Sequence, residues 1–161
     1  LGANLKPVEW VSDMPFSGMQ AILTAEAAAA FDALTRSDQD TLLVRQNAGA
    51  WPNLFRSARF TSAVDYINAN RARYELVEKV NQLMKNYDVI VTPSFGGSQL
   101  LTTNLTGHPC VVLKNGYNTN GSPTSISFIG NLFDEATILA VARAYQEATE
   151  YDEQHPPKFI D

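Results

Sequence analysis

The chain has 161 residues, a formal net charge of −5 and a hydrophobic content of 45%, with charged residues making up 18%. This composition is typical of a globular protein and excludes an intrinsically disordered one. The acidic balance and the scattered basic residues argue against a nucleic-acid-binding surface. No apolar stretch has the length of a membrane span, and the single cysteine, Cys110, excludes an internal disulfide. We therefore expect neither a nucleic acid nor a membrane as partner.

The length suits a single domain over residues 1–161, with residues 154–161 as a tail. The sequence assigns no compartment. The cytoplasm is the default expectation, and a signal peptide in a longer parent, upstream of Leu1, stays open. Cys110 opens an apolar run, and we interpret it as a small buried hydrophobic side chain.

The amino-terminal part predicts a strand and then a helix. Residues 1–16, with apolar side chains punctuated by prolines, are expected to form a strand and a connector. Ser17 and Gln20 have the spacing of a capping box, which satisfies two backbone donors at the start of a helix. Apolar residues then recur at helical spacing as far as Leu34.

Two further helices are predicted before the middle of the chain. Pro52 is expected to open a short helix that ends near Arg56, because proline fits the first turn of a helix. A second long helix is predicted from Thr61 or Ser62 to about Asn86, with its apolar residues along one side.

An unbroken run of β-branched residues, Val89-Ile90-Val91, predicts a short strand buried on both faces. Pro93 has no N–H to donate, so we expect the strand to end at Thr92 and a loop to follow over residues 93–109. In open α/β sheets, ligands bind at the carboxyl ends of strands, which makes this loop a candidate site.

The last third predicts a hairpin and a helix. Residues 110–114 and 125–129 are expected to be strands that pair antiparallel across a turn at 116–121. Asp134 is expected to cap a final helix, which His155-Pro156-Pro157 would end. Together these elements predict an α/β protein with a mixed sheet flanked by helices.

Five segments carry a family resemblance in their order and spacing. They are Phe60-Thr-Ser-Ala-Val-Asp-Tyr-Ile-Asn-Ala-Asn-Arg, Asp88-Val-Ile-Val-Thr-Pro, Asn104-Leu-Thr-Gly-His-Pro, Gly121-Ser-Pro-Thr-Ser-Ile-Ser-Phe-Ile-Gly and Phe133-Asp-Glu-Ala-Thr-Ile-Leu. The chain resembles, over essentially its whole length, the C-terminal portion of the amidase signature hydrolases. The resemblance implies the C-terminal part of the amidase signature fold. It also implies a parent enzyme that cleaves a carboxamide C–N bond through an acyl-serine, without metal or organic cofactor.

In that family the chemistry uses a serine nucleophile, a second serine on a cis peptide and a lysine base. The serines lie in a Gly-Gly-Ser-Ser-Gly-Gly-like segment upstream of the region matched here, and this chain contains no such segment. Gly96-Gly97-Ser98 is followed by Gln99, so we interpret Ser98 as a loop residue. We assign no catalytic residue, no metal ligand and no cofactor, and leave open whether this chain by itself is an enzyme.

The resemblance implies a narrower role for the strand end and the following loop, as part of the wall of the substrate cavity. The residues it implicates in substrate binding are Thr92, Pro93, Gly96, Gly97, Asn104 and Thr106. The structural alternative is that Asn104 caps a turn that Thr106 helps to shape. In the tRNA-dependent amidotransferase branch, an acidic residue before the asparagine helps to recognise glutamine. Residues 99–103 hold no acid here, which favours a less polar or a different amide.

Three functions follow from these observations. The first is the C-terminal part of an amidase, supplying scaffold and cavity wall for a small-molecule amide and inactive alone. The second is a non-catalytic α/β binding or assembly module. The third is a self-contained serine hydrolase using Ser98, His108 and Asp88, which the residues around Ser98 disfavour because they form no nucleophile elbow. Open sheet edges would also predict self-association, or pairing with the N-terminal part of a parent enzyme.

Overall fold

The structure is a computed structural model that describes residues 2–156 of the chain. The chain divides into two compact units, one of Leu1–Ser12 and Leu76–Asp161 and the other of Asp13–Glu75. The boundary lies within helix α4 (Ala63–Met84). The expected single domain stays a prediction, and each unit is described by itself.

The unit of residues 13–75 is helical. It contains α1 (Phe16–Ala30), α2 (Asp32–Arg36), the short 3-10 helix η1 (Gln39–Leu42), α3 (Trp51–Ala58) and the first part of α4. Helix α1 packs on α3. The ring of Phe55 stacks on Phe31 and on Trp51, with centroids 5.0 and 5.5 Å apart. Helix α3 confirms the short helix expected at Pro52.

The start of α1 differs from the prediction. No strand forms over residues 2–15, so the strand expected at residues 1–16 is wrong for the part that the structure describes. Pro15 occupies the N-cap position of α1 with no side-chain cap, and Ser17 lies inside the helix. The predicted capping box is therefore wrong. The helix also breaks at Phe31, where φ is −101° and ψ is 24°.

Helix α4 begins close to where the sequence predicts. The Ser62 hydroxyl accepts a hydrogen bond from the Asp65 N–H at 3.0 Å, which satisfies one of the free donors of the first turn. In the other unit, the carboxyl-terminal part of α4 places Leu76, Val80 and Met84 at four-residue spacing, and all three are buried. This spacing gives the helix one continuous apolar side.

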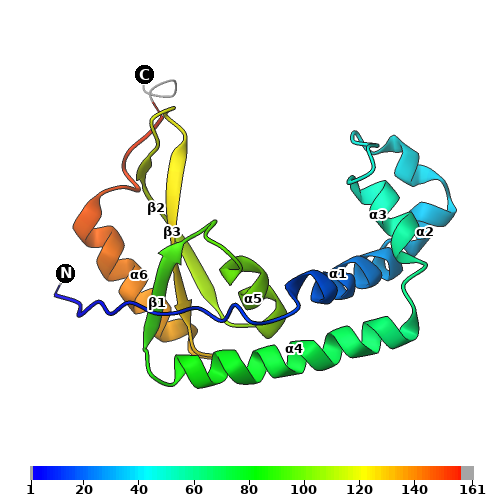
Figure 1. The fold of residues 1–161 in the computed structure, drawn as a ribbon. Coiled ribbons are helices and arrows are strands. Elements are labelled where there is room, and N and C mark those ends of the chain that lie inside the picture. Colours follow the sequence, from blue (N-terminus) through cyan, green and yellow to red (C-terminus); the bar gives the residue numbers. More distant parts are fainter. Residues whose placement is uncertain (1, 157–161) are drawn as a thin grey trace. The chain divides into compact units, whose positions relative to one another are not determined.

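The second unit is built on a sheet of three strands, β1 (Val89–Pro93), β2 (Cys110–Tyr117) and β3 (Pro123–Gly130), in the order β1-β3-β2 (Figure 1). Both pairings are antiparallel, so the predicted β2–β3 hairpin is confirmed. The α/β class is also confirmed, although no parallel pair of a mixed sheet occurs among the described strands.

Strand β1 lies at an edge of this sheet. Val91 is 40% exposed, so the prediction of a strand buried on both faces is wrong for this chain. The physical reason is that β1 has a neighbour on one side only among the described strands, and that neighbour is β3.

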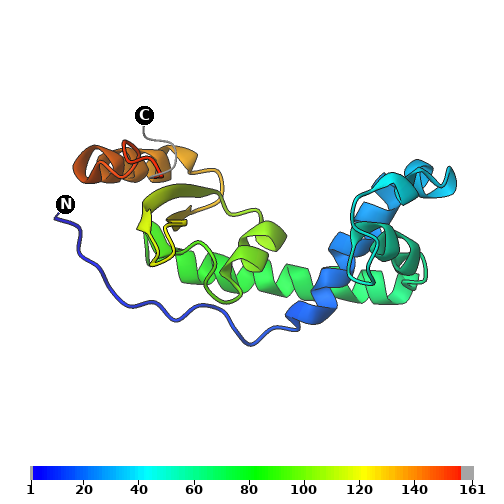
Figure 2. The same cartoon turned by 90° about the horizontal axis from the view of Figure 1, so that it is seen from above.

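One face of the sheet is covered by α6 (Glu135–Thr149), which packs across β2 and β3 (Figures 1 and 2). The Phe128 ring lies 5.4 Å from that of Tyr145. Glycine at position 130 lets α6 pack this closely on β3, because a Cβ there would lie 2.5 Å from Ile138 Cγ2. Helix α6 and strand β3 are therefore in close contact at Gly130, with no room for a side chain there.

The ends of α6 differ from the prediction. Asp134 stands at the N-cap but accepts from the Thr137 hydroxyl, at 2.7 Å, and no side-chain cap to a backbone N–H forms. The helix ends at Thr149, because Glu150 turns into the left-handed region with φ 51°. It therefore stops before His155-Pro156-Pro157, and Pro157 lies outside the described residues.

The residues after α6 return to the sheet. The Gln154 carbonyl accepts hydrogen bonds from the Lys114 ammonium and from the Tyr117 hydroxyl, the second at 3.0 Å. The expected tail of residues 154–161 is therefore tied down at its first residue, and residues 157–161 lie outside the described part of the chain. Within residues 2–156, no helix combines the length and apolar character needed to cross a bilayer.

The expected loop of residues 93–109 contains a helix, α5 (Gln99–Thr106). Gly107 ends α5 in the left-handed region with φ 80°, a conformation that glycine adopts without a steric cost. Trp10 Nε1 donates to Thr102 Oγ1 at 3.3 Å and so ties the amino-terminal segment to α5.

Candidate functional site

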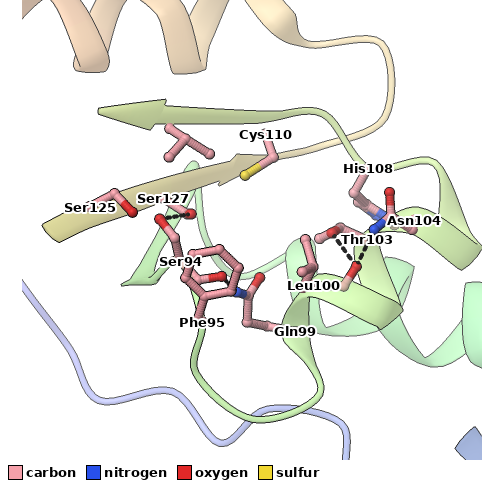
Figure 3. Close-up of a pocket in the computed structure, with 11 residues that line it drawn as sticks. Ser94, Phe95, Gln99, Leu100, Thr103, Asn104, His108, Cys110, Ser125 and Ser127 are labelled. Carbon is pink, nitrogen blue, oxygen red and sulfur yellow. Dashed lines mark hydrogen bonds between the residues drawn. The ribbon is translucent and has the colours of Figure 1, made fainter. Parts of the chain in front are cut away.

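A pocket of about 350 Å³ lies where the loop after β1 and helix α5 meet strands β2 and β3 (Figure 3). Both polar and apolar side chains line this pocket. These are Ser94, Phe95, Gln99, Leu100, Thr103, Asn104, His108, Cys110, Val112, Ser125 and Ser127. The volume falls at the lower end of the range of small-molecule sites.

Strand register decides which sheet residues reach this pocket. Val112 pairs with Ser127, and Cys110 pairs with Ile129, so these side chains share one face of the sheet. Phe128, one residue further along β3, points to the opposite face and to α6. The pocket therefore occupies the face of the sheet that α6 does not cover.

Gln99 is held in one orientation by the backbone. Its Nε2 donates to the Ser94 carbonyl at 2.7 Å and to the Pro93 carbonyl at 3.2 Å. Turning the amide over would place its oxygen against two carbonyl oxygens, so the assignment follows from the partners. The side chain is buried, and its Oε1 has no hydrogen-bond partner.

His108 is also buried, at 4% exposure, and its ring is fixed by Thr106. Thr106 Oγ1 lies 2.9 Å from the Thr102 carbonyl and 2.8 Å from His108 Nδ1. The hydroxyl has one hydrogen, and the carbonyl can only accept. Both short contacts hold a hydrogen only if the hydroxyl donates to Thr102 and Nδ1–H donates to Thr106.

This arrangement makes the other ring nitrogen of His108 an acceptor. Burial lowers the pKa of His108 below its usual 6.5, which keeps the imidazole neutral at pH 7. A neutral ring with a proton on Nδ1 carries a lone pair on Nε2, and this atom is buried without a partner. The pocket thus contains two buried acceptors, Gln99 Oε1 and His108 Nε2.

Two hydroxyls of the pocket contact each other. The Ser127 hydroxyl donates to Ser94 Oγ at 2.9 Å, and both residues are buried (Figure 3). Cys110 is exposed, so its interpretation as a buried hydrophobic side chain is wrong. Partial burial of the thiol still raises the pKa of Cys110, which disfavours the reactive thiolate.

The six residues that the sequence implicated do not meet in one place. A second pocket, of about 1100 Å³, lies between β1 and the amino-terminal segment, and it is lined by Thr92, Pro93, Gly96 and Gly97 among others. Asn104 lines the 350 Å³ pocket instead. Thr106 lines neither pocket, and its hydroxyl contacts the ring of His108, which lines the smaller one.

Their local geometry explains this separation. Thr92 Oγ1 donates to the neighbouring Pro93 carbonyl at 3.1 Å, and Gly97 takes a positive φ of 65° in the loop. Asn104 lies on α5 and donates to the Leu100 carbonyl at 2.8 Å, so it does not cap a turn. The helix in the expected loop is the feature that moves Asn104 and Thr106 away from the other four residues.

The structure does not assemble the serine hydrolase triad. Ser98 and Asp88 line the larger pocket and His108 lines the smaller one. The Ser98 hydroxyl lies 3.5 Å from the Val11 carbonyl. Among residues 2–156, no group of three or more His, Cys, Asp or Glu side chains is arranged to hold a metal ion.

Sequence reasoning missed Gln99, Ser94 and the sheet serines, and considered His108 only as a triad member. The one available signal was the alternation of serine and apolar residues along β3, which puts Ser125 and Ser127 on one face. Nothing in the sequence shows that Gln99 turns toward the loop carbonyls.

Solved structures with a similar fold include amidases. The chain aligns with the structure of a peptide amidase from Stenotrophomonas maltophilia at a TM-score of 0.65 and 19% identity, over 91% of this chain and 36% of that one. An amidase family protein from Bacillus anthracis aligns at 0.59 and 17%, over 81% and 25%. The fold is therefore that of the amidase signature enzymes.

Sequence comparison leads to the same family. The chain is 35% identical over 112 residues to a subunit of the glutamyl-tRNA(Gln) amidotransferase of Oceanobacillus iheyensis, covering 53% of this chain and 23% of that protein. No family model matches. The chain spans about a quarter of the length of the curated relatives it matches. The resemblance to the C-terminal portion of the amidase signature hydrolases is confirmed in sequence and in fold.

Proposed function

We propose that this chain supplies the C-terminal part of an amidase, a carboxamide C–N hydrolase that acts through an acyl-serine. Its contribution is scaffold and part of the substrate cavity. The observation that carries the proposal is the joint match in sequence and fold to amidases, over about a quarter of the length of the curated relatives. Two pockets beside β1 support it, the smaller one at the carboxyl end of the strand and the larger one along its length.

The proposal makes the chain inactive alone. The acyl-serine chemistry of the family needs a nucleophile and a base, and the sequence contains no Gly-Gly-Ser-Ser-Gly-Gly-like segment. Removing a nucleophile lowers turnover by about a millionfold in a well-studied hydrolase. In this proposal Thr92, Pro93, Gly96 and Gly97 contact substrate from the larger pocket and Asn104 from the smaller one. Thr106 lines neither pocket and contributes by holding the His108 ring.

The reading frame upstream of Leu1 tests the proposal most directly. We expect it to encode a Gly-Gly-Ser-Ser-Gly-Gly-like segment preceded by a lysine. The complete product should release ammonia from small amides and react with a fluorophosphonate probe, whereas the 161-residue chain should do neither. Ammonia release by the chain itself would contradict its inactivity. A start codon at Leu1, with no such segment upstream, would favour the binding or assembly module.

The sheet edges support a second element of the proposal, pairing with other polypeptide. Strands β1 and β2 are the outer strands among those described, so each has one edge without a strand partner. Unpaired edges recruit further strands. We therefore expect the chain to self-associate, or to bind the N-terminal part of the parent enzyme. Analytical ultracentrifugation of the chain at high concentration tests this, and a stable monomer would count against it.

A further inference from the structure

The chain contains two Asn-Gly pairs, and both lie on the β2–β3 hairpin. Asn115-Gly116 belongs to β2, and Asn120-Gly121 belongs to the turn between β2 and β3. Asparagine followed by glycine loses its side-chain amide readily, because glycine has no Cβ to hinder attack by its own backbone nitrogen. The two pairs share this chemistry, but the structure gives them different surroundings.

Asn115 and Gly116 are held within the sheet. Asn115 stands at the break in register between β2 and β3, and Gly116 is paired with β3. Both residues are half-buried, and Asn115 Oδ1 is buried without a hydrogen-bond partner among the described residues. On either side, the Lys114 ammonium and the Tyr117 hydroxyl donate to the Gln154 carbonyl. This pair changes its backbone shape only if the end of the sheet opens.

Asn120 and Gly121 lie in the turn, and both are exposed to solvent. A Cβ added at Gly121 would have no neighbour within 4 Å among the described residues. Attack by the glycine nitrogen requires the asparagine side chain to eclipse the following C–N bond, which the backbone of a regular strand does not allow. A turn reaches such a shape more easily, because exposed turns open at a much lower free energy than paired strands.

Asn118 holds this turn together. The backbone N–H groups of Asn120 and Ser122 donate to Asn118 Oδ1, at 2.9 and 3.0 Å. The N–H of Gly121, between them, donates to the Asn118 carbonyl at 3.0 Å. The Gly121 nitrogen must leave this bond before it reacts. Because the Asn118 side chain fixes the residues on both sides of that nitrogen, it opposes the movement.

We propose that Asn120 is a site of spontaneous deamidation and that Asn118 sets its rate. The Gly121 nitrogen loses its proton and attacks Asn120 Cγ, and the side-chain nitrogen leaves as ammonia, which gives a cyclic imide. Water then opens the ring, at Cγ to give aspartate or at the backbone carbonyl to give isoaspartate. Either product adds a negative charge to the turn, and isoaspartate also inserts a methylene group into the backbone. This chemistry needs no active site and is independent of the proposed function.

The test follows both asparagines in one sample. The full chain is incubated at mildly alkaline pH and digested with pepsin at intervals, and fragment ions in mass spectra locate each amide that has become a carboxylate. We expect Asn120 to react at least about tenfold faster than Asn115, because the strand around Asn115 must open first. In guanidinium chloride the two rates should be comparable, since each pair then has only its own sequence. A ratio in the folded chain no larger than that in the unfolded chain would overturn the proposal.

Two variants test the role of Asn118. Asn118→Ala removes the Oδ1 acceptor and should speed the reaction of Asn120 about fivefold, the factor that one lost hydrogen bond supplies. Asn118→Asp keeps an acceptor oxygen and is the matched control, with a rate close to that of the unchanged chain. The rate at Asn115 shows whether the hairpin stays folded in each variant, because unfolding would speed both sites. An unchanged Asn120 rate in Asn118→Ala would contradict the role of the side chain.

The products identify the route. Direct hydrolysis of the Asn120 side chain gives aspartate alone, whereas opening of the cyclic imide also gives isoaspartate. We expect the incubated chain to accept methyl groups from an isoaspartyl methyltransferase, with the label in the peptide that contains residue 120. Aspartate at this position without isoaspartate would overturn the attack by Gly121.

Discussion

The two faces of the β1-β3-β2 sheet are built differently, although they alternate residue by residue along the same strands. On the α6 face, Phe128 is 3% exposed and Gly130 leaves no room for a Cβ. On the opposite face, Ser127 contacts Ser94 beside a pocket of about 350 Å³. The α6 face contributes stability through close packing. The pocket face retains unpaired buried polar atoms, Gln99 Oε1 and His108 Nε2, which cost stability.

The largest difference between the faces should appear on truncating their apolar side chains. Phe128→Ala removes a buried ring that packs on Tyr145, and we expect the free energy of unfolding to fall by about 3–5 kcal/mol. Val112→Ala, on the pocket face and 55% exposed, should cost less than about 1 kcal/mol. Urea unfolding followed by circular dichroism measures both. Similar losses for the two variants would remove the contrast.

A smaller effect should follow from adding one methyl group. Gly130→Ala places a Cβ 2.5 Å from Ile138 Cγ2, and overpacking of this kind costs about 1–3 kcal/mol. Gly18→Ala is the control, since Gly18 lies in α1 and an added Cβ there would have no neighbour within 4 Å, so it should be neutral or slightly stabilising. A loss in the control equal to that of Gly130→Ala would show that close packing is not the cause.

Next in size is the serine pair of the pocket face. Ser127→Ala deletes the hydroxyl that donates to Ser94 at 2.9 Å, and we expect a loss of about 1 kcal/mol. In a double-mutant cycle with Ser94→Ala, the second substitution should cost less than it does alone, because the shared hydrogen bond is already gone. Strict additivity would mean that the two hydroxyls do not interact.

The smallest expected effect is on pH dependence. Burial lowers the pKa of His108 in the folded chain below 6.5, so the unfolded chain binds the proton more readily. Stability should therefore be unaffected by this group well above pH 6.5 and should fall as the pH drops through that value. Between pH 7 and pH 6 the loss from one such histidine is at most about 0.7 kcal/mol.

The variant His108→Phe isolates this contribution. Its stability should fall less between pH 7 and pH 6 than that of the unchanged chain, in paired urea titrations. Identical pH slopes would show that the His108 ring is not held neutral by its surroundings.

Much of the fold follows from local sequence rules. Ser62 caps α4, Pro52 lies in the first turn of α3, and the turn-rich segment between β2 and β3 makes a hairpin, because each rule acts within a few residues. The failures have long-range causes. Val91 is half-exposed because of which strands are present beside β1, and that cannot be known from Val89-Ile90-Val91 alone.

The candidate site was less predictable than the fold. Helix α5 was hidden because its residues, Gln99–Thr106, are rich in threonine and lack a clear apolar stripe. Because the sequence did not predict α5, residues that belong to two separate pockets were expected to line one cavity. The pairing of Gln99 with the carbonyls of Pro93 and Ser94 depends on how the loop folds back, which is tertiary information.

The contact between Gly130 and Ile138 also limits how this chain can diverge. If the side chain at position 130 becomes larger before position 138 changes, it clashes with Ile138. If the side chain at position 138 becomes smaller before position 130 changes, a void is left beside the sheet. Neither order of change passes through a fully stable intermediate. The two positions are therefore expected to be inherited together or exchanged together.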